Sequence, residues 1–310
     1  MTFAIAASGI RPDVKGFFDP RSWTIQYVVS DRATRMCAIV DPVLDFDEKS
    51  GATGTMSADA ILAHVAKEGL TVEWILDTHP HADHFSAAHY LKARTGAPTA
   101  IGARIVDVQR LWKGIYNWPA LPADGSQWDR LFGAGERFKV GSIDGHVLFS
   151  PGHTLASITY VIGDVAFVHD TLFMPDSGTV RADFPHGSAR ALWASIQEIL
   201  ALPDETRIFT GHDYQPGGRE PRWESAVAEQ KRGNPHIAGR DVAIRLAARR
   251  ARPDTADAQA HPACAAGKRP RRPSAGPRGQ WPTLSQISAR RADRRCLGIG
   301  EPWRAFPTHR

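Results

Sequence analysis

The sequence predicts an α/β protein in which mixed sheets are covered by helices. Short apolar segments rich in β-branched residues alternate along the chain with segments that have the 3.6-residue period of a helix. Several predicted strands follow one another with no helix between them. Because parallel neighbours need a long crossover, this order favours sheets with both parallel and antiparallel pairs over a purely parallel sheet.

The predicted strands are apolar segments bounded by turn-forming residues. The first two, WTIQYVV and MCAIVD, are typical of a hairpin or meander. In chain order, the strands are expected at residues 23–29, 36–41, 72–77, 144–150, 157–163, 165–170 and 206–211.

Three segments are predicted to be helices, at residues 57–69, 84–96 and 188–202. Apolar residues recur at helical spacing in the first, and the third is amphipathic. Ser57 and Ser188 are candidate N-caps, because a serine hydroxyl can accept a hydrogen bond from a backbone N–H of the first turn. Gly69 and Gly96 are expected to end the first two helices.

The composition is that of an ordinary globular protein, with 310 residues, 42% hydrophobic and 23% charged. No apolar stretch approaches the roughly 20 residues that span a bilayer. The N-terminal segment has no basic residue before its apolar run, so we expect mature sequence rather than a signal peptide. The three cysteines are far apart, which favours a reducing compartment, the cytoplasm; they are Cys37, Cys264 and Cys296.

Charge divides the chain into two parts. Residues 240–310 carry 16 basic and 5 acidic residues, a net charge of +11, whereas residues 1–239 carry −6. The second part is rich in Arg and Pro and poor in large aliphatic residues, so we expect a disordered tail after a folded domain over 1–239. The abrupt change of composition near residue 240 suggests that the tail is translated out of frame. A basic arm that binds nucleic acid is the alternative, but aromatic residues are sparse and no nucleic-acid module is recognised, so nucleic acid is not the expected partner.

A dense group of metal-ligand residues follows the strand predicted at 72–77. The stretch THPHADH places His79 and His81 two residues apart in an extended segment, where their side chains project to the same side. Asp83 and His84 come next and can reach a second point nearby. A lone histidine is most often a packing or surface residue, but this spacing at the end of a strand predicts a metal site.

Three other predicted strands deliver a ligand-type side chain at their ends. His153 follows the strand at 144–150 through a Pro-Gly bend, Asp170 ends the strand at 165–170, and His212 follows the strand at 206–211. Together with the THPHADH group, they make seven candidate ligands, five histidines and two aspartates.

The order THxHxDH, PGHT, a strand-terminal Asp and GHDY resembles the metallo-β-lactamase superfamily over about residues 20–236. The resemblance implies an αββα sandwich of two mixed sheets, with metal at one edge between them. It further implies one metal site formed by His79, His81 and His153, and a second formed by Asp83, His84 and His212. Asp170 would bridge the two, and Asp83 and Asp170 are the expected catalytic carboxylates.

Two branches of the family imply different chemistry. In a glyoxalase II-like thioesterase, two metal ions, zinc or mixed iron and zinc, generate a hydroxide that attacks a thioester. In persulfide dioxygenases, one Fe(II) is held by the triad His79, His153 and Asp170, and glutathione persulfide is oxidised to sulfite. The other four residues would then surround the ligands. Both branches keep all seven residues, so the ligand count does not decide between them.

The surrounding sequence favours the dioxygenase branch. GTVRADF at 178–184 and GHDY at 211–214 resemble its segments, and FPHGSARALWASIQEILALPDETRIFTGHDYQPGGR and RLWKGIYNW resemble the β-lactamase hydrolase-like group linked to sulfide detoxification. The expected partner is thus a small thiol substrate, glutathione persulfide. No membrane partner is expected. A homodimer stays open, as does another metallo-hydrolase such as a lactonase. A scaffold without catalysis is not favoured, because no ligand is lost.

Several further residues have competing interpretations. Arg181 and Tyr214 are candidates for binding substrate, although Arg181 could instead pair with Asp183. Asp77 is expected to orient a ligand imidazole or a backbone turn. His169 stands where relatives have a small residue, and we expect it outside the ligand set. Aromatic residues of a predicted loop could close over the site or pack locally; they are Trp112, Tyr116 and Trp118.

Overall fold

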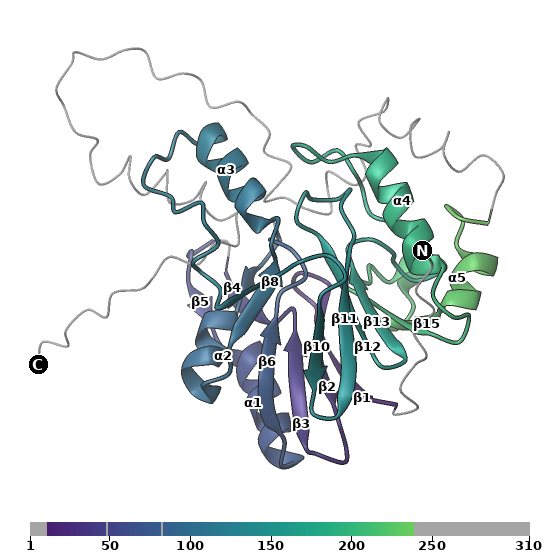
Figure 1. The fold of residues 1–310 in the computed structure, drawn as a ribbon, viewed down its shortest axis with the longest axis horizontal. Helices are drawn as coiled ribbons and strands as arrows, with labels where there is room; N and C mark the ends of the chain where they lie inside the picture. The colour runs from purple at the N-terminus through teal and green to yellow at the C-terminus, as the bar shows by residue number, and fades with distance from the viewer. Residues whose placement is uncertain (1–10, 48, 82, 239–310) are drawn as a thin grey trace, which may run out of the picture.

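The computed structural model describes residues 11–47, 49–81 and 83–238. The predicted tail at 240–310 lies outside the described residues. Figure 1 shows two sheets packed face to face, with helices on their outer sides. The prediction of an α/β fold with an αββα sandwich is confirmed.

The first sheet has six strands in the order β1-β2-β3-β6-β8-β9. The pairs β1–β2 and β2–β3 are antiparallel, and the remaining neighbours are parallel, so the sheet is mixed as expected. Its strands are β1 (Asp13–Asp19), β2 (Thr24–Ser30), β3 (Met36–Val40), β6 (Thr71–Leu76), β8 (Thr99–Gly102) and β9 (Arg130–Phe132).

The second sheet also has six strands, in the order β10-β11-β12-β13-β14-β15. Only β13 and β14 pair in parallel within it. Its strands are β10 (Arg137–Val140), β11 (Ile143–Phe149), β12 (Ile158–Ile162), β13 (Val165–His169), β14 (Arg207–Thr210) and β15 (Glu224–Ala226). A small third sheet joins β5 (Thr53–Gly54), β4 (Val43–Phe46) and β7 (Phe85–Ser86).

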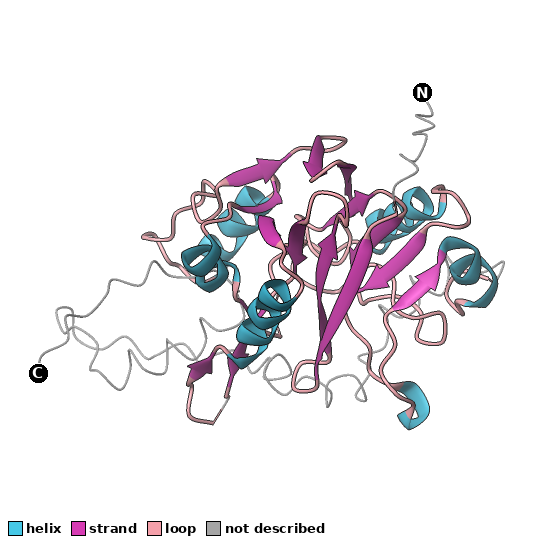
Figure 2. Cartoon of the chain, turned by 90° about the horizontal axis from the view of Figure 1, so that it is seen from below, coloured by secondary structure: helices cyan, strands magenta, loops and turns pink. Residues whose placement is uncertain are grey.

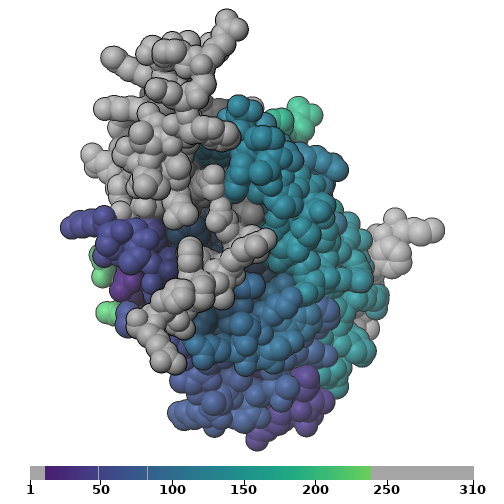
Figure 3. Space-filling view, turned by 90° about the vertical axis from the view of Figure 1, so that its left-hand side faces the viewer, coloured from purple at the N-terminus to yellow at the C-terminus, as the bar shows by residue number. Residues whose placement is uncertain are grey.

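Helices cover the outer face of each sheet, as the view from below also shows (Figure 2). Helices α1 (Met56–Lys67) and α2 (Ala88–Thr95) pack on the first sheet through a cluster that includes Ile61 and Leu91. Helices α4 (Ala189–Leu200) and α5 (Val227–Gly233) cover the second sheet. Helix α3 (Ile105–Ile115) forms a separate apolar cluster, and Figure 3 shows the blue-to-teal face of the molecule to which α2 and α3 belong.

The core between the sheets explains why the central strands are apolar on both faces. Strands β2, β12 and β13 are buried at every position, because one face meets the opposite sheet and the other meets helices. The inter-sheet cluster includes Tyr27, Tyr160 and Phe167. Within the described part of the chain, no helix is both long enough and apolar enough to cross a membrane.

Two predicted element boundaries need correction. The helix expected at 84–96 begins only at Ala88, because Phe85 and Ser86 pair with β4 instead. Ser57 is not the N-cap of α1, since Thr55 holds that position and the Ser57 hydroxyl donates to Asp45, with an O–O distance of 2.6 Å. Ser188 is the N-cap of α4, and its hydroxyl accepts from the N–H of Ala191 at 3.2 Å.

Candidate metal centre

The segment after β6 is bent into the site by a buried carboxylate. Asp41, at the end of the neighbouring strand β3, accepts hydrogen bonds from both the N–H and the hydroxyl of Thr78, each at 2.7 Å. This contact places the next residues at the strand ends, and His79 and His81 are 2% and 4% exposed. Asp41 was not identified from the sequence, although it too ends an apolar strand.

The other candidate ligands come from strand ends of the second sheet. His153 follows β11, Asp170 follows β13, and His212 follows β14. All three side chains are buried. The ends of one strand of the first sheet and three of the second therefore meet at the same place.

His79, His153 and Asp170 form one group of potential ligands. One ligand atom from each lies within 4.8 Å of the others. The carboxylate oxygen Oδ2 of Asp170 is 3.7 Å from Nε2 of His79 and 3.5 Å from Nε2 of His153. Two imidazoles and one carboxylate thus converge on a space of the size that a metal ion needs.

The remaining residues lie against this group. His81, Asp83 and His84 form a second group within 4.8 Å. Nε2 of His212 lies 3.6 Å from Oδ2 of Asp83 and 3.3 Å from Oδ1 of Asp170. The two oxygens of Asp170 therefore face different histidines, and all seven residues lie in one cluster.

Buried atoms without hydrogen-bond partners indicate that these residues fit a metal ion. Among the described residues, such atoms include Nδ1 of His81, Nε2 of His84 and Oδ1 of Asp170. A buried polar atom left without a partner costs about 1–3 kcal/mol. Imidazole nitrogens and carboxylate oxygens are ligands for iron and zinc, so a bound cation would satisfy atoms that the protein leaves unpaired.

His81 differs from His79 and His153 in its contacts. Its Nε2 lies 3.2 Å from Oδ1 of Asp41, which leaves only Nδ1 for another partner. Burial alone would lower the pKa of His81, but the carboxylate of Asp41, with Asp83 and Asp77, raises it to about 9. Burial and the neighbouring imidazoles hold the pKa of His79 well below its ordinary value, which keeps it in the neutral form that binds metals.

Other ligand-type histidines are oriented through the ring nitrogen that faces away from the cluster. Nδ1 of His153 donates to the carbonyl of Arg181 at 3.0 Å, and Nδ1 of His212 lies 3.3 Å from the carbonyl of Ser22. Thr24 donates to Oδ2 of Asp83 at 3.2 Å. Contacts of this kind fix the tautomer and the direction of a ligand. Ser22 and Thr24 were missed in the sequence, because nothing local links them to residues so distant along the chain.

Asp77 lies near His81 and Asp41, but its carboxylate accepts hydrogen bonds from other side chains. Its carboxylate accepts from the hydroxyl of Ser86 and from the indole of Trp128, both at 2.8 Å. Burial raises the pKa of Asp77 to about 6, against the effect of the Trp128 hydrogen bond. Asp77 therefore connects two segments that flank the site through their side chains.

The two substrate-binding candidates lie beside the cluster. The guanidinium of Arg181 pairs with the carboxylate of Asp183 through two contacts of 2.5 and 2.7 Å, and both side chains are about half exposed. Arg181 therefore forms the pair with Asp183 that was the alternative to a role in substrate binding. Tyr214 is 36% exposed and its ring stacks on His212 with a centroid distance of 5.6 Å.

The aromatic segment predicted as a loop is partly helical. Trp112 lies within α3 and stacks on Tyr116 at 5.3 Å, whereas Trp118 follows the helix. The loop interpretation is therefore wrong for Trp112. Its ring packs against the cluster formed by Ile105 and Val108, which supports local packing for this residue.

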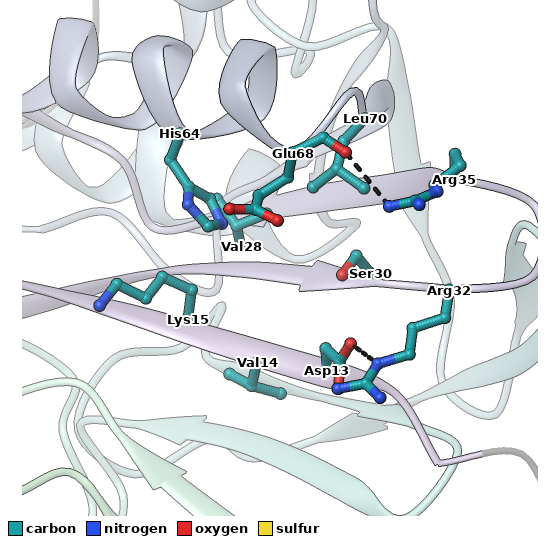
Figure 4. Close-up of a pocket in the computed structure, with 10 residues that line it drawn as sticks. All are labelled: Asp13, Val14, Lys15, Val28, Ser30, Arg32, Arg35, His64, Glu68 and Leu70. Carbon is teal, nitrogen blue, oxygen red and sulfur yellow. Dashed lines mark hydrogen bonds and ion pairs between the residues drawn. The ribbon is translucent and has the colours of Figure 1, made fainter.

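A separate hollow of about 130 Å³ lies at the other end of the first sheet (Figure 4). It lies between β1, β2 and the end of α1. Two of its arginines are engaged, because Arg32 pairs with Asp13 and Arg35 donates to the carbonyl of Glu68. None of the seven candidate ligands lines it, so it is not part of the metal centre.

The fold and this cluster define a class of protein, an αββα sandwich with potential metal ligands at strand ends of both sheets. A sequence model described as the metallo-beta-lactamase superfamily matches residues 32–212. The chain belongs to that superfamily, as its motifs predicted.

Relatives include proteins of both predicted branches. The chain is 73% identical over 244 residues to the beta-lactamase hydrolase-like protein of Xylella fastidiosa (strain 9a5c), covering 79% of this chain and 57% of that protein. It is 29% identical to the mitochondrial persulfide dioxygenase ETHE1 of Mus musculus, covering 75% and 78%. It is 33% identical to the hydroxyacylglutathione hydrolase of Rhodospirillum rubrum, covering 61% of each chain.

Among solved structures, the crystal structure of ETHE1 from Myxococcus xanthus matches with a TM-score of 0.62 and 31% identity, covering 78% of this chain and 92% of that one. The chain spans only about half the length of the curated relatives to which it is 72–73% identical. A metal-dependent enzyme is supported by the superfamily and by the grouped His and Asp residues.

Proposed function

We propose that this chain is a persulfide dioxygenase-like enzyme that converts glutathione persulfide, molecular oxygen and water to sulfite and glutathione, in sulfide detoxification. The observation that carries the proposal is the group of His79, His153 and Asp170, whose ligand atoms lie within 4.8 Å of one another. Two histidines and one carboxylate are the ligand set of non-haem Fe(II) oxygenases. Nε2 of His81 instead lies 3.2 Å from Oδ1 of Asp41.

In this proposal the triad would hold one Fe(II), which supplies open positions for a sulfur ligand and for oxygen. The protein residues supply orientation. The carbonyl of Arg181 directs Nε2 of His153 toward Asp170, and Phe184 packs edge-on against the His153 ring at 4.9 Å. The pair Arg181–Asp183 and the ring of Tyr214 lie beside the cluster, where they could bind the glutathione part of a substrate. The relatives named as a persulfide dioxygenase and as ETHE1 support this assignment.

The second candidate is a glyoxalase II-like thioesterase with two metal ions. One observation favours it: His84 groups with Asp83, whose Oδ2 lies 3.6 Å from Nε2 of His212, and Nε2 of His84 is buried without a hydrogen-bond partner among the described residues. A second ion would satisfy this atom. The relative named hydroxyacylglutathione hydrolase belongs to this alternative.

Metal content and oxygen consumption together test the proposal. We expect one iron per chain and oxygen uptake with glutathione persulfide, with no hydrolysis of S-lactoylglutathione. Two zinc ions per chain with thioester hydrolysis and no oxygen uptake would overturn the proposal in favour of the thioesterase.

Two variants sharpen the test. His153→Ala removes a proposed ligand, so we expect it to lose the metal and at least about 100-fold in activity. His84→Ala should still bind one ion per chain at saturating iron. If His84→Ala instead reduces the metal content from two ions to one, the site is dinuclear.

A further inference from the structure

His169 has a backbone conformation that disfavours its own residue type. It ends β13 with a φ of 33°, in the left-handed region where glycine is favoured. The pairing of β13 with β14 shifts register between Phe167 and His169. The facing chain is close, since a Cβ at Gly211 would lie 2.9 Å from Cα of His169. A histidine is therefore kept where glycine would relieve strain.

The imidazole of His169 contacts two of the three residues in the proposed triad. Its Nδ1 accepts a hydrogen bond from the backbone N–H of Asp170. Its ring centroid lies 4.5 Å from that of His79, with the planes tilted by 32°. The side chain is 1% exposed. His169 thus holds the backbone of one proposed ligand and packs against the ring of another.

The rest of the ring adds no stabilising contact that would explain its presence. Because Nδ1 accepts, the single ring hydrogen lies on Nε2, and this atom is buried with no hydrogen-bond partner among the described residues. Backbone strain and an unpaired donor both oppose folding, and such strain concentrates at functional sites.

We propose that His169 is a positioning residue for the metal centre, which fixes the direction of the Asp170 carboxylate and the plane of the His79 ring. The proposal rests on the triad proposed above, but not on the oxygen chemistry. It applies equally if the enzyme is a thioesterase.

Metal affinity measured by competition with a chromogenic chelator tests this role, using the full chain and Co(II) as the probe. We expect His169→Gly to bind Co(II) about 10–100-fold more weakly than the wild type, as for other residues that orient ligands. The visible spectrum of the bound Co(II) should shift, which a purely structural change elsewhere would not cause.

The metal-free His169→Gly protein should have a higher melting temperature than metal-free His169→Ala, since only glycine adopts this φ without strain. His146→Ala, which removes a partly buried histidine of β11, is the matched control and should match the wild type in affinity and spectrum.

Two further variants keep the test decisive if His169→Gly does not fold. His169→Leu keeps the bulk and the strain but cannot accept the Asp170 N–H, so its affinity should fall by about 10-fold or more. His169→Asn tolerates this φ and offers an acceptor oxygen, so it should recover most of the affinity. Wild-type affinity and spectrum in both His169→Gly and His169→Leu would overturn the role of His169 alone. A wild-type protein that binds no metal would overturn the metal centre itself.

Discussion

At the scale of single residues, imidazoles of the candidate metal centre are oriented by oxygen atoms of residues far from them in the sequence, such as the Asp41 carboxylate at His81 and the Arg181 carbonyl at His153. His79, His153 and Asp170 could be named from the sequence because each follows an apolar strand, and strand ends are where an α/β fold gathers side chains. Their supports could not, because Asp41 and the carbonyl of Arg181 reach the histidines only through tertiary structure. The orienting contacts therefore had to come from the fold.

Asp31 provides a test at this scale that is independent of the metal. Its buried carboxylate accepts from the N–H and hydroxyl of Ser142, at 2.8 and 2.6 Å, from the Thr34 hydroxyl and from the Ala33 N–H. It joins a turn of the first sheet to a turn of the second. An asparagine has one acceptor oxygen and cannot accept all four bonds, so Asp31→Asn should lower the free energy of unfolding by about 2 kcal/mol. Urea unfolding at pH 7 measures this difference.

The stability difference between wild type and Asp31→Asn should become smaller as the pH is lowered. Burial would raise the pKa of Asp31, but the hydrogen bonds from Ser142, Ala33 and Thr34 hold it below its ordinary value. A lowered folded-state pKa stabilises the fold above the unfolded value of about 3.9, and this contribution is lost as the pH falls through the folded-state value. The gap between wild type and Asp31→Asn should therefore narrow below about pH 4. The exposed Asp107→Asn is the control, with a change within about 0.5 kcal/mol; a gap that stays constant down to pH 3 contradicts this account.

At the scale of elements, local pattern predicted the central strands and α4 well, but not where α2 begins. The segment from His84 has a helical pattern, yet Phe85 and Ser86 pair with Leu44 and Val43 of β4. This pairing is non-local, so no window of sequence around residue 85 contains it. Strands β1 and β9 were also missed, because β1 is only partly buried along most of its length and β9 has three residues.

Helix α4 docks directly on the segment that carries His153. Gly152 has a φ of 144°, and a Cβ there would lie 2.4 Å from the backbone N and Cα of Leu192. The carbonyl of Gly152 also accepts from the N–H of Ser188 at 2.9 Å. Gly152→Ala must push the helix away from the segment, so we expect it to lower the free energy of unfolding by about 3 kcal/mol and to weaken metal binding. Thermal unfolding and chelator competition measure the two effects.

Gly96→Ala is the matched control for this substitution. Gly96 also has a positive φ, of 74°, but a Cβ there would meet nothing within 4 Å. Gly96→Ala should lower the free energy of unfolding only by the strain of an alanine in the left-handed region, about 1 kcal/mol, and should leave metal binding unchanged. Equal losses in both variants would show that the contact between Gly152 and Leu192 does not support the site.

At the scale of the whole molecule, the fold could be predicted from the sequence because its motifs and its strand order agree. The strand order required mixed sheets, and the spacing of THPHADH, PGHT and GHDY placed ligands at the strand ends. The assignment of strands to two separate sheets did not follow from local pattern. It depends on the inter-sheet core, where Tyr27 of one sheet packs on Phe167 and Phe209 of the other.

The described residues also predict at which residue the chain can be truncated without loss of the folded domain. The segment before residue 238 is engaged: the Asn234 amide donates to the carbonyl of Gly178 at 2.9 Å, and Ile237 packs against the outer cluster of the second sheet. All seven candidate ligands and their supports precede it. We therefore expect a chain ending at residue 238 to keep the unfolding midpoint and the metal content of the full chain, as thermal unfolding and elemental analysis would show.

A chain ending at residue 226 is the control. It lacks α5, whose Val227 and Gln230 are fully buried, and should lose about 3 kcal/mol or more of stability. Loss of folding in the longer chain would mean that residues 239–310 contribute to the folded unit, and the division at residue 239 would then be wrong.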